Sequence, residues 1–389
     1  MRYKYKPVTA NQTPMNIAFF APMKSPWHPV PSGDRLMARQ LMKALEGGGA
    51  HVRLASELRI YAREPSEAWL GEVKAAAAAE ADRLIAAWTS ECWLPDIWFS
   101  YHTYYKAPDF IGPAIASHFG VPMVTVEASY AKRRATGAWS AWHAANLACL
   151  RAARCHFTMT ARDRRGLAQM PGQAAELYDL PPFIDTTDFT GDFVENFIAA
   201  QGGHTVSDPV RLITVAMMRA DVKRKSYMFL SRALAEISDL NWTLDIVGDG
   251  PVRSEIEHAF ADLPAGRVTW HGKLERSSIV ELFRCGDMFV WPGIDEAYGL
   301  AFLEAQAMGL PVVALDNAGV PEVVRHNVTG LLVRRADTQA YAAALRCYIE
   351  APILRATHGR QARAFVMNER SLEQARQRIF RILEKIVYT

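Results

Sequence analysis

The sequence has few cysteines, no long apolar run and almost no excess charge of either sign. Its five cysteines stand alone without a Cys-x-x-Cys pair, which is typical of a reducing compartment and argues against a zinc site or a disulfide framework. No stretch approaches roughly 18 consecutive apolar residues, so no membrane-spanning helix is expected. A net charge of +3 is too mild for a typical nucleic-acid-binding protein. Residues 1–14 are polar and precede only a short apolar run, so we expect no signal peptide and a cytoplasmic location.

The length and the order of predicted elements indicate an α/β protein of two domains. A chain of 389 residues exceeds one typical hydrophobic core and suits two domains. Buried strands alternate with helices, beginning with a strand, a glycine-containing loop and a helix, which is typical of a Rossmann-like domain. The periodicity weakens after residue 186, where glycines gather. We therefore predict a first domain at 1–190, a linker at 191–209, a second domain at 210–367 and a terminal helix at 368–389.

Residues 291–315 hold the most informative motif. They predict a strand end, a Pro-Gly loop, a helix at about 298–308 and a second strand, which together form the repeating unit of a parallel sheet. Gly299 lies at the first turn of this helix, where unpaired backbone N–H groups favour an anion, most simply a diphosphate. Glu296 and Glu304 lie eight positions apart. Because carboxylates accept hydrogen bonds from sugar hydroxyls, we expect them to bind hydroxyls on either side of the diphosphate.

Glu-x7-Glu followed by Ala-x-Ala-x-Gly-x-Pro-Val-Val resembles the donor-site motif of the retaining GT-B glycosyltransferases of family 4, also called glycosyl transferases group 1. The resemblance covers the second domain and, more loosely, the first. It implies two Rossmann-like domains facing across a cleft, with a terminal helix that crosses back to the first. The implied reaction moves a hexosyl unit from a nucleoside diphosphate sugar to an acceptor hydroxyl with retention of configuration. By resemblance, Glu296 contacts the donor sugar, Glu304 binds the ribose, and the diphosphate lies at Gly299 with its neighbours Ala297, Tyr298 and Leu300.

A basic segment follows the first predicted strand of the second domain. Basic residues between a strand and a helix can neutralise a diphosphate from the side opposite Gly299. The family has an Arg followed by Lys-Gly at this place. Arg219 matches the Arg, and Lys225 matches the Lys if one residue is inserted, with Arg224 as the competing assignment and Ser226 where Gly is usual. The resemblance also places Gly248 near the nucleotide and His271 near its base.

Three residues of the first domain are further candidates. Gly33 opens a predicted helix; by resemblance its loop lies near the transferred sugar, although Ser32-Gly33-Asp34 also fits a plain helix cap and turn. His102 lies in a polar aromatic loop at the carboxyl end of a strand, where ligands bind in open α/β sheets, and a structural histidine is the alternative. Glu127 stands where many relatives have His. A carboxylate there can bind an acceptor hydroxyl or accept its proton.

The remaining expectations concern partners and cofactors. Basic clusters at 132–134 and at 162, 164 and 165 are either solvated surface or contacts to a membrane surface or an anionic acceptor. The resemblance implies a nucleotide-sugar donor, a sugar-containing or lipid-linked acceptor and peripheral membrane contact, with no nucleic acid. We expect no metal or other cofactor, because the basic segment can balance the diphosphate charge. A nucleotide-sugar epimerase or sugar phosphorylase of the same fold, or a non-catalytic sugar-nucleotide binder, remains an alternative.

Overall fold

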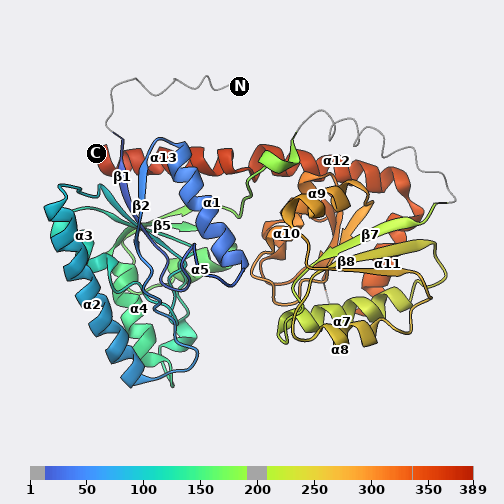
Figure 1. Cartoon of the computed structure of the whole chain (residues 1–389), viewed down its shortest axis with the longest axis horizontal. Helices are drawn as coiled ribbons and strands as arrows, with labels where there is room; N and C mark the ends of the chain where they lie inside the picture. The colour runs from blue at the N-terminus through green and yellow to red at the C-terminus, as the bar shows by residue number, and fades with distance from the viewer. Residues whose placement is uncertain (1–13, 191–207, 335, 389) are drawn as a thin grey trace. The chain divides into compact units, whose positions relative to one another are not determined.

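The computed structural model describes residues 14–190, 208–334 and 336–388. The chain forms two compact units (Figure 1). The first unit runs through Leu180 and resumes at Ala375, and the second comprises Pro181–Gln374. Residues 181–190, which the sequence analysis assigns to the first domain, pack with the second unit. Most of the predicted linker, 191–207, lies outside the described residues.

The first unit is built on one parallel sheet of six strands with helices on both of its faces. The strand order is β2-β1-β3-β4-β5-β6, and every described pair is parallel. Residues of α2, α3 and α4 share one core cluster with alternate residues of β1 and β3, so these helices cover the same face. The elements are β1 (Asn16–Phe20), α1 (Gly33–Gly47), β2 (His51–Ser56), α2 (Glu67–Ser90), β3 (Ile97–Tyr101), α3 (Gly112–Phe119), β4 (Met123–Val126), η1 (Lys132–Arg134), α4 (Ser140–Ala152), β5 (Ala153–Thr158), α5 (Ala161–Ala168) and β6 (Glu176–Asp179).

The second unit repeats this plan with the strand order β12-β11-β10-β7-β8-β9. In Figure 1, α7 and α8 lie on one side of the β7–β8 pair, and α9 and α12 lie on the other. The elements are η2 (Thr187–Phe189), β7 (Val210–Val215), α7 (Val222–Ala235), β8 (Trp242–Val247), α8 (Arg253–Ala259), β9 (Val268–Gly272), α9 (Arg276–Arg284), β10 (Met288–Val290), α10 (Leu300–Ala307), β11 (Val312–Leu315), η4 (Val320–Glu322), β12 (Gly330–Val333), α11 (Thr338–Glu350), α12 (Pro352–Glu369) and α13 (Leu372–Tyr388).

Local sequence explains where several helices begin. The Ser32 hydroxyl accepts a hydrogen bond from the Arg35 amide and caps α1, and Ser66 does the same for α2 through the amide of Trp69. A polar side chain that accepts an orphan N–H in this way typically stabilises a helix by about 1 kcal/mol. The alanine-rich α2 then buries one face against the sheet through Leu70, Val73, Ala77, Ala81, Leu84 and Trp88.

The strand order places a candidate site at one edge of each sheet. The order reverses between β1 and β3 in the first unit and between β7 and β10 in the second, because the chain adds strands on one side of each pair and then on the other. Ligands of open α/β sheets bind outside the carboxyl ends of the strands at such reversals. The loops after β1 and β3, and those after β7 and β10, are therefore the places to look for function.

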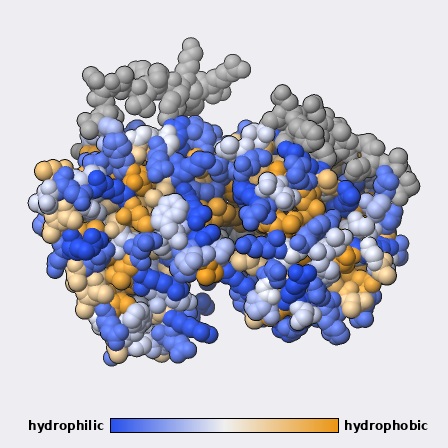
Figure 2. Space-filling view, in the orientation of Figure 1, coloured by the Kyte–Doolittle hydropathy of each residue, from blue (hydrophilic) through white to orange (hydrophobic). Residues whose placement is uncertain are grey.

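The visible surface of each unit is of mixed polarity. In the view of Figure 2, hydrophilic and hydrophobic side chains are interspersed over each unit. None of the helices in the described ranges is long and apolar enough to cross a membrane.

Candidate functional site

The loop between β10 and α10 is held in place by glycines. Gly299 is the N-cap of α10 with a φ of 78°, so this helix begins at Leu300, two positions later than predicted from the sequence, and still offers its first N–H groups beside Gly299. A Cβ on Gly319 would lie 1.5 Å from the carbonyl oxygen of Ala297, so only glycine fits behind the loop. The Gly319 amide also donates to the carbonyl of Glu296 at 3.1 Å. The predicted site residues Glu296, Ala297 and Gly299 therefore share a backbone of fixed shape.

The carboxylate of Glu296 is paired with Lys223. Their side chains are only 15% and 19% exposed, and the Lys223 ammonium also lies 5.5 Å from the ring centroid of Trp291. The Trp291 indole N–H donates to Glu296 over 3.5 Å, and the Trp291 ring packs edge-on against Tyr227. One carboxylate and one ammonium are thus held together beside the first turn of α10, in surroundings where charge interactions are stronger than in bulk water.

The predicted basic residues at the start of α7 differ in their exposure and in their partners. Arg224 pairs with Glu255 at the surface. Lys225 is exposed, and Arg219 lies half-buried before the helix. Lys223, which the sequence analysis did not single out, is the lysine that meets Glu296. Its position depends on α7 beginning at Val222, which places Lys223 in the first turn of the helix.

Ser226, which stands where the resemblance implies a glycine, links α7 to the loop after β10. It is buried, its hydroxyl donates to the carbonyl of Val222 at 3.0 Å and accepts from the amide of Ile294 at 3.1 Å. The serine therefore supports the loop that carries Glu296.

Glu304 lines a cavity of about 230 Å³ within the second unit. Its carboxylate is paired with Arg276 at 2.6 Å, and Arg276 also pairs with Asp188 at 2.5 Å. Burial raises the pKa of Glu304, and the Arg276 charge acts against this rise. The sequence analysis missed Arg276, because its contact with Glu304 depends on how α9 packs beside α10. The cavity is lined by Phe189, Leu274, Arg276, Ile279, Val280, Phe283 and Glu304.

Gly248 and His271 lie at the ends of neighbouring strands in the same unit. A Cβ on Gly248 would lie 1.9 Å from the carbonyl oxygen of Ala216, which excludes any other residue there without movement. The His271 Nε2 lies 2.6 Å from the carboxylate of Asp245, which fixes the orientation of the imidazole. Tyr298 is buried and Leu300 begins α10, so both contribute to packing of the predicted donor loop.

In the first unit the structure brings His102 close to Glu127 and to Asp34, a residue that was not predicted from the sequence. The His102 Nδ1 lies 3.2 Å from Asp34 and 3.9 Å from Glu127. Gly33 is the first residue of α1, so Asp34 reaches His102 from the first turn of that helix. His102 and Glu127 both have left-handed φ values, 59° and 55°. Such a conformation costs a non-glycine residue roughly 1–2 kcal/mol, so the surrounding contacts must hold both side chains in place.

The contacts among His102, Asp34 and Glu127 shift the pKa of His102 and that of Glu127. Burial by itself lowers the pKa of His102, but the negative charges of Glu127 and Asp34 outweigh it and raise the pKa to about 9. Burial raises the pKa of Glu127 to about 7, although the positive charge of His102 acts against the rise. An imidazolium with two carboxylates, one of which titrates near neutral pH, can hold or exchange a proton at the carboxyl edge of this sheet.

We expect NMR titration of the imidazole Cε1 protons to find His102 protonated until the pH approaches 9. His156 is the internal control, because burial lowers its pKa to about 4 and it should stay neutral throughout. Since the folded-state pKa of His102 lies above its ordinary 6.5, its protonation contributes stability that is fully present below about pH 6.5 and is lost as the pH rises through about 9. Glu127→Gln should lower the midpoint by roughly one unit. An unchanged midpoint would contradict the assigned contact.

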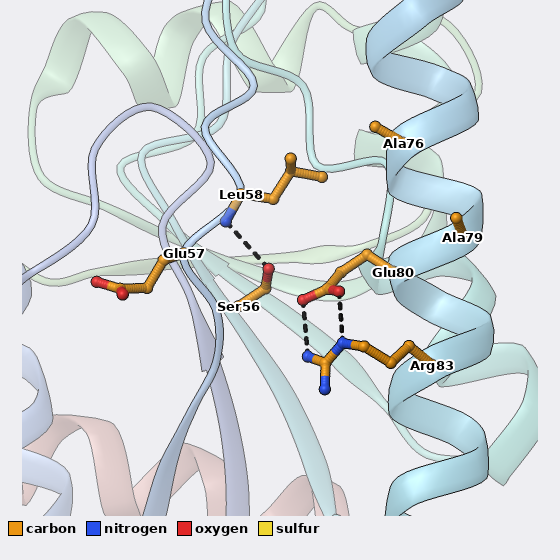
Figure 3. A pocket seen from close by; sticks show the side chains of 7 residues that line it. All are labelled: Ser56, Glu57, Leu58, Ala76, Ala79, Glu80 and Arg83. Carbon is orange, nitrogen blue, oxygen red and sulfur yellow. Dashed lines mark hydrogen bonds and ion pairs between the residues drawn. The ribbon is translucent and has the colours of Figure 1, made fainter.

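The first unit also has a groove that the predicted site residues do not line. It has a volume of about 490 Å³ and lies between the end of β2 and α2 (Figure 3). Glu80 and Arg83 on its wall bind each other at 2.7 and 2.9 Å, which neutralises both charges. Ser56 accepts from the amide of Leu58. None of the predicted site residues lines this groove.

One family model matches most of the second unit. Residues 209–351 match the family model described as glycosyl transferases group 1. The group 1 segment includes the β7–α7 region and both glutamates of the predicted motif, so the resemblance found in the sequence is confirmed.

Relatives and solved structures agree with this assignment. The chain is 32% identical over 216 residues to a GDP-mannose-dependent monoacylated alpha-(1-6)-phosphatidylinositol monomannoside mannosyltransferase from Corynebacterium glutamicum, covering 53% of this chain and 55% of the relative. It is 34% identical over 193 residues to a GDP-mannose-dependent alpha-(1-6)-phosphatidylinositol monomannoside mannosyltransferase from Mycobacterium tuberculosis, covering 46% and 49%. The chain thus spans about half the length of these curated relatives.

Solved structures extend the likeness of fold to nearly the whole chain. A sucrose-phosphate synthase from Thermosynechococcus elongatus superposes with a TM-score of 0.71 at 18% identity, covering 96% of this chain and 99% of the other. An Anabaena protein in complex with UDP and glucose gives 0.65 at 19% identity, covering 95% and 99%. The predicted fold class, α/β with the GT-B architecture, is confirmed by these neighbours and by the two parallel sheets.

Proposed function

We propose that this chain is a retaining glycosyltransferase that moves a hexosyl unit from a nucleoside diphosphate sugar to an acceptor hydroxyl. In the proposed reaction the acceptor oxygen bonds to the anomeric carbon while the bond from that carbon to the diphosphate oxygen breaks. The acceptor proton passes to the leaving diphosphate on the same face. The products are a glycoside of unchanged anomeric configuration and a nucleoside diphosphate, so no enzyme nucleophile is consumed.

The observation that carries the proposal is the pairing of both motif glutamates around the start of α10. Glu296 with Lys223 lies in the loop before Gly299, and Glu304 with Arg276 lies inside the helix at a cavity. The first N–H groups of α10 lie between them and suit a diphosphate. A sugar on one side and a ribose on the other would give each carboxylate hydroxyl groups to accept from.

Cations of the same unit supply the charge that the leaving diphosphate needs. We propose that Arg219 and Lys225 contact the diphosphate, as the resemblance implies, and that Lys223 acts beside Glu296. Stabilising charge that develops on a leaving group is commonly worth a factor of 10²–10³ per donor. With several cations available, we propose that transfer needs no divalent metal. In the first unit, Glu127 and His102 are proposed to face the acceptor.

The test is a thermal-shift panel followed by product analysis. Ligands that bind only the folded state raise the melting temperature by mass action, so UDP, GDP and ADP are compared with their sugar conjugates, GDP-mannose included because two relatives carry that dependence in their names. We expect one nucleotide series to stabilise the protein, and the product formed with an acceptor extract to keep the donor's anomeric configuration in the presence of EDTA. Absence of any shift at millimolar ligand would overturn the proposal. Binding without turnover would favour a non-catalytic binder, and an altered free nucleotide sugar would favour an epimerase.

A further inference from the structure

Two segments of the first unit that are separate in sequence meet to form a cluster of aromatic rings and cations. The ring of Tyr105 lies 5.1 Å from that of Trp139, edge to face. The guanidinium of Arg134, from η1, lies 5.0 Å from the centroid of Tyr105. The ammonium of Lys106 lies 5.0 Å from the centroid of Trp139. We call these four residues, Tyr105, Lys106, Arg134 and Trp139, the aromatic–cation cluster.

A tight turn presents one half of the cluster. The amide of Ala107 donates to the carbonyl of Tyr104 at 2.8 Å and the amide of Tyr104 donates back at 3.3 Å, so Tyr105 and Lys106 form the tip of a small loop. The amide of Ala62 donates to the carbonyl of Lys106 at 2.8 Å and ties this tip to the segment after β2. The backbone under the cluster is therefore hydrogen-bonded on both sides.

A buried polar network supports the tip from below. The Asp109 carboxylate accepts hydrogen bonds from the Trp98 indole at 2.7 Å and from the amides of Ile111 and Gly112 at 3.0 and 2.8 Å. The Asp109 amide donates to the Thr103 hydroxyl at 3.1 Å. Such a network is costly to bury and rigid when satisfied. The network thus supports the loop that carries Tyr105 and Lys106, as a preorganised binding site requires.

The cations of the cluster are not neutralised by the protein. Within the described residues, neither Lys106 nor Arg134 takes part in an ion pair or a side-chain hydrogen bond. Two further cations of η1, Lys132 and Arg133, have exposed side chains. The Arg134 Nε is buried and has no hydrogen-bond acceptor among the described atoms. A guanidinium in this state favours a phosphate or carboxylate that accepts from it.

A row of aromatic rings connects the aromatic–cation cluster to His102 in the same unit. The ring of Tyr104 lies 5.5 Å from Tyr105 and 5.3 Å from His102, so aromatic rings run from the cluster to the imidazole that contacts Asp34 and Glu127. A sugar whose anionic group binds Lys106 and Arg134 would extend along these rings. Half-exposed aromatic rings provide flat apolar area against the C–H faces of a sugar.

We propose that the aromatic–cation cluster binds an anionic sugar, one that carries a phosphate or a carboxylate. The anionic group binds Lys106 and Arg134, the sugar ring packs on Tyr105 and Trp139, and a hydroxyl points toward His102 and Glu127. The binding site stands on its own geometry. That the bound sugar is the acceptor rests on the proposed glycosyl transfer.

The test is isothermal titration of the full chain with glucose 6-phosphate, glucuronate, glucose and inorganic phosphate. We expect the two anionic sugars to bind at least about tenfold more tightly than glucose and than phosphate, because both the charge-assisted hydrogen bonds and the ring contacts contribute. Arg134→Gln and Lys106→Gln should each weaken binding about tenfold and reduce its salt dependence. Trp139→Leu should weaken anionic sugars and leave phosphate binding unchanged. Arg83→Gln, which removes a paired arginine of the same unit, should match the wild type.

Specific results would overturn this inference. Equal binding of glucose and glucose 6-phosphate would remove the role of the cations, and equal binding of inorganic phosphate would remove that of the rings. Sedimentation with phosphatidylglycerol vesicles that is lost in Arg134→Gln, without binding of any soluble anionic sugar, would make the cluster a membrane contact. Nucleotide binding is measured in the same preparations. Nucleotide binding without binding of any anionic sugar would refute only this inference. Binding of an anionic sugar without binding of any nucleotide would refute only the proposed glycosyl transfer.

Discussion

Replacing Glu296 with glutamine is expected to lower the rate of glycosyl transfer by about 10²–10³-fold, the usual effect of removing one preorganised polar contact at a reacting centre. The exchange keeps the shape of the side chain and removes its charge. The half-buried Lys223 then loses its charged partner, and a donor sugar meets a neutral amide, with one oxygen that accepts and one NH2 that donates, in place of a carboxylate. The affinity for the bare nucleoside diphosphate, measured by thermal shift, should change much less than the rate.

The partner and a control sharpen this experiment. Lys223→Gln should reduce transfer by a similar factor, and the double variant should be little worse than the worse single one if the two groups act as a unit. Lys225→Gln tests the sequence-based assignment, and we expect it to weaken both transfer and diphosphate binding. Arg232→Gln removes an exposed cation from the last turn of the same helix and should leave transfer unchanged. More than a third of wild-type transfer in Glu296→Gln would contradict the assigned role.

Asp109→Ala is expected to destabilise the first unit by about 3–5 kcal/mol, the range for removing one partner of a buried charged network. The substitution leaves the Trp98 indole and the amides of Ile111 and Gly112 without their acceptor in a fully buried place. It also removes the acceptor of the amides at the start of α3, whose N-cap residue Ile111 provides no side-chain hydrogen bond. The measurement is the free energy of opening of β1 and β3, from hydrogen exchange of their amides in a urea series.

Two further variants separate the buried network from an ordinary cap. Asp109→Asn keeps one acceptor oxygen and should restore part of the lost stability. Ser66→Ala removes the exposed cap of α2 in the same unit and should cost only about 1 kcal/mol. If Asp109→Ala cost no more than Ser66→Ala, the network would not hold the loop that carries Tyr105 and Lys106.

The sequence predicts what depends on local pattern and misses what depends on packing at a distance. The β10–α10 motif and the alternation of strands and helices follow from residues adjacent in the chain. Lys223 was missed because its role depends on the exact start of α7. Arg276 reaches Glu304 only once α9 and α10 are packed, 28 positions apart. Asp34 lies next to the predicted Gly33, yet its contact with His102 exists only because β1 and β3 are neighbours in the sheet.

The first unit is completed by the last helix of the chain. The ring of Phe380 on α13 lies so near α1 that a Cβ on Gly48 would be 2.0 Å from it, and Ala375, Ile379 and Leu383 are buried. During synthesis, residues 14–180 leave the ribosome long before α13 does. The surface beside Gly48 that α13 covers therefore stays exposed while the second unit is translated. Exposed apolar surface of this kind attracts chaperones and invites aggregation. We therefore expect residues 14–180 to reach their final stability only after α13 has been translated.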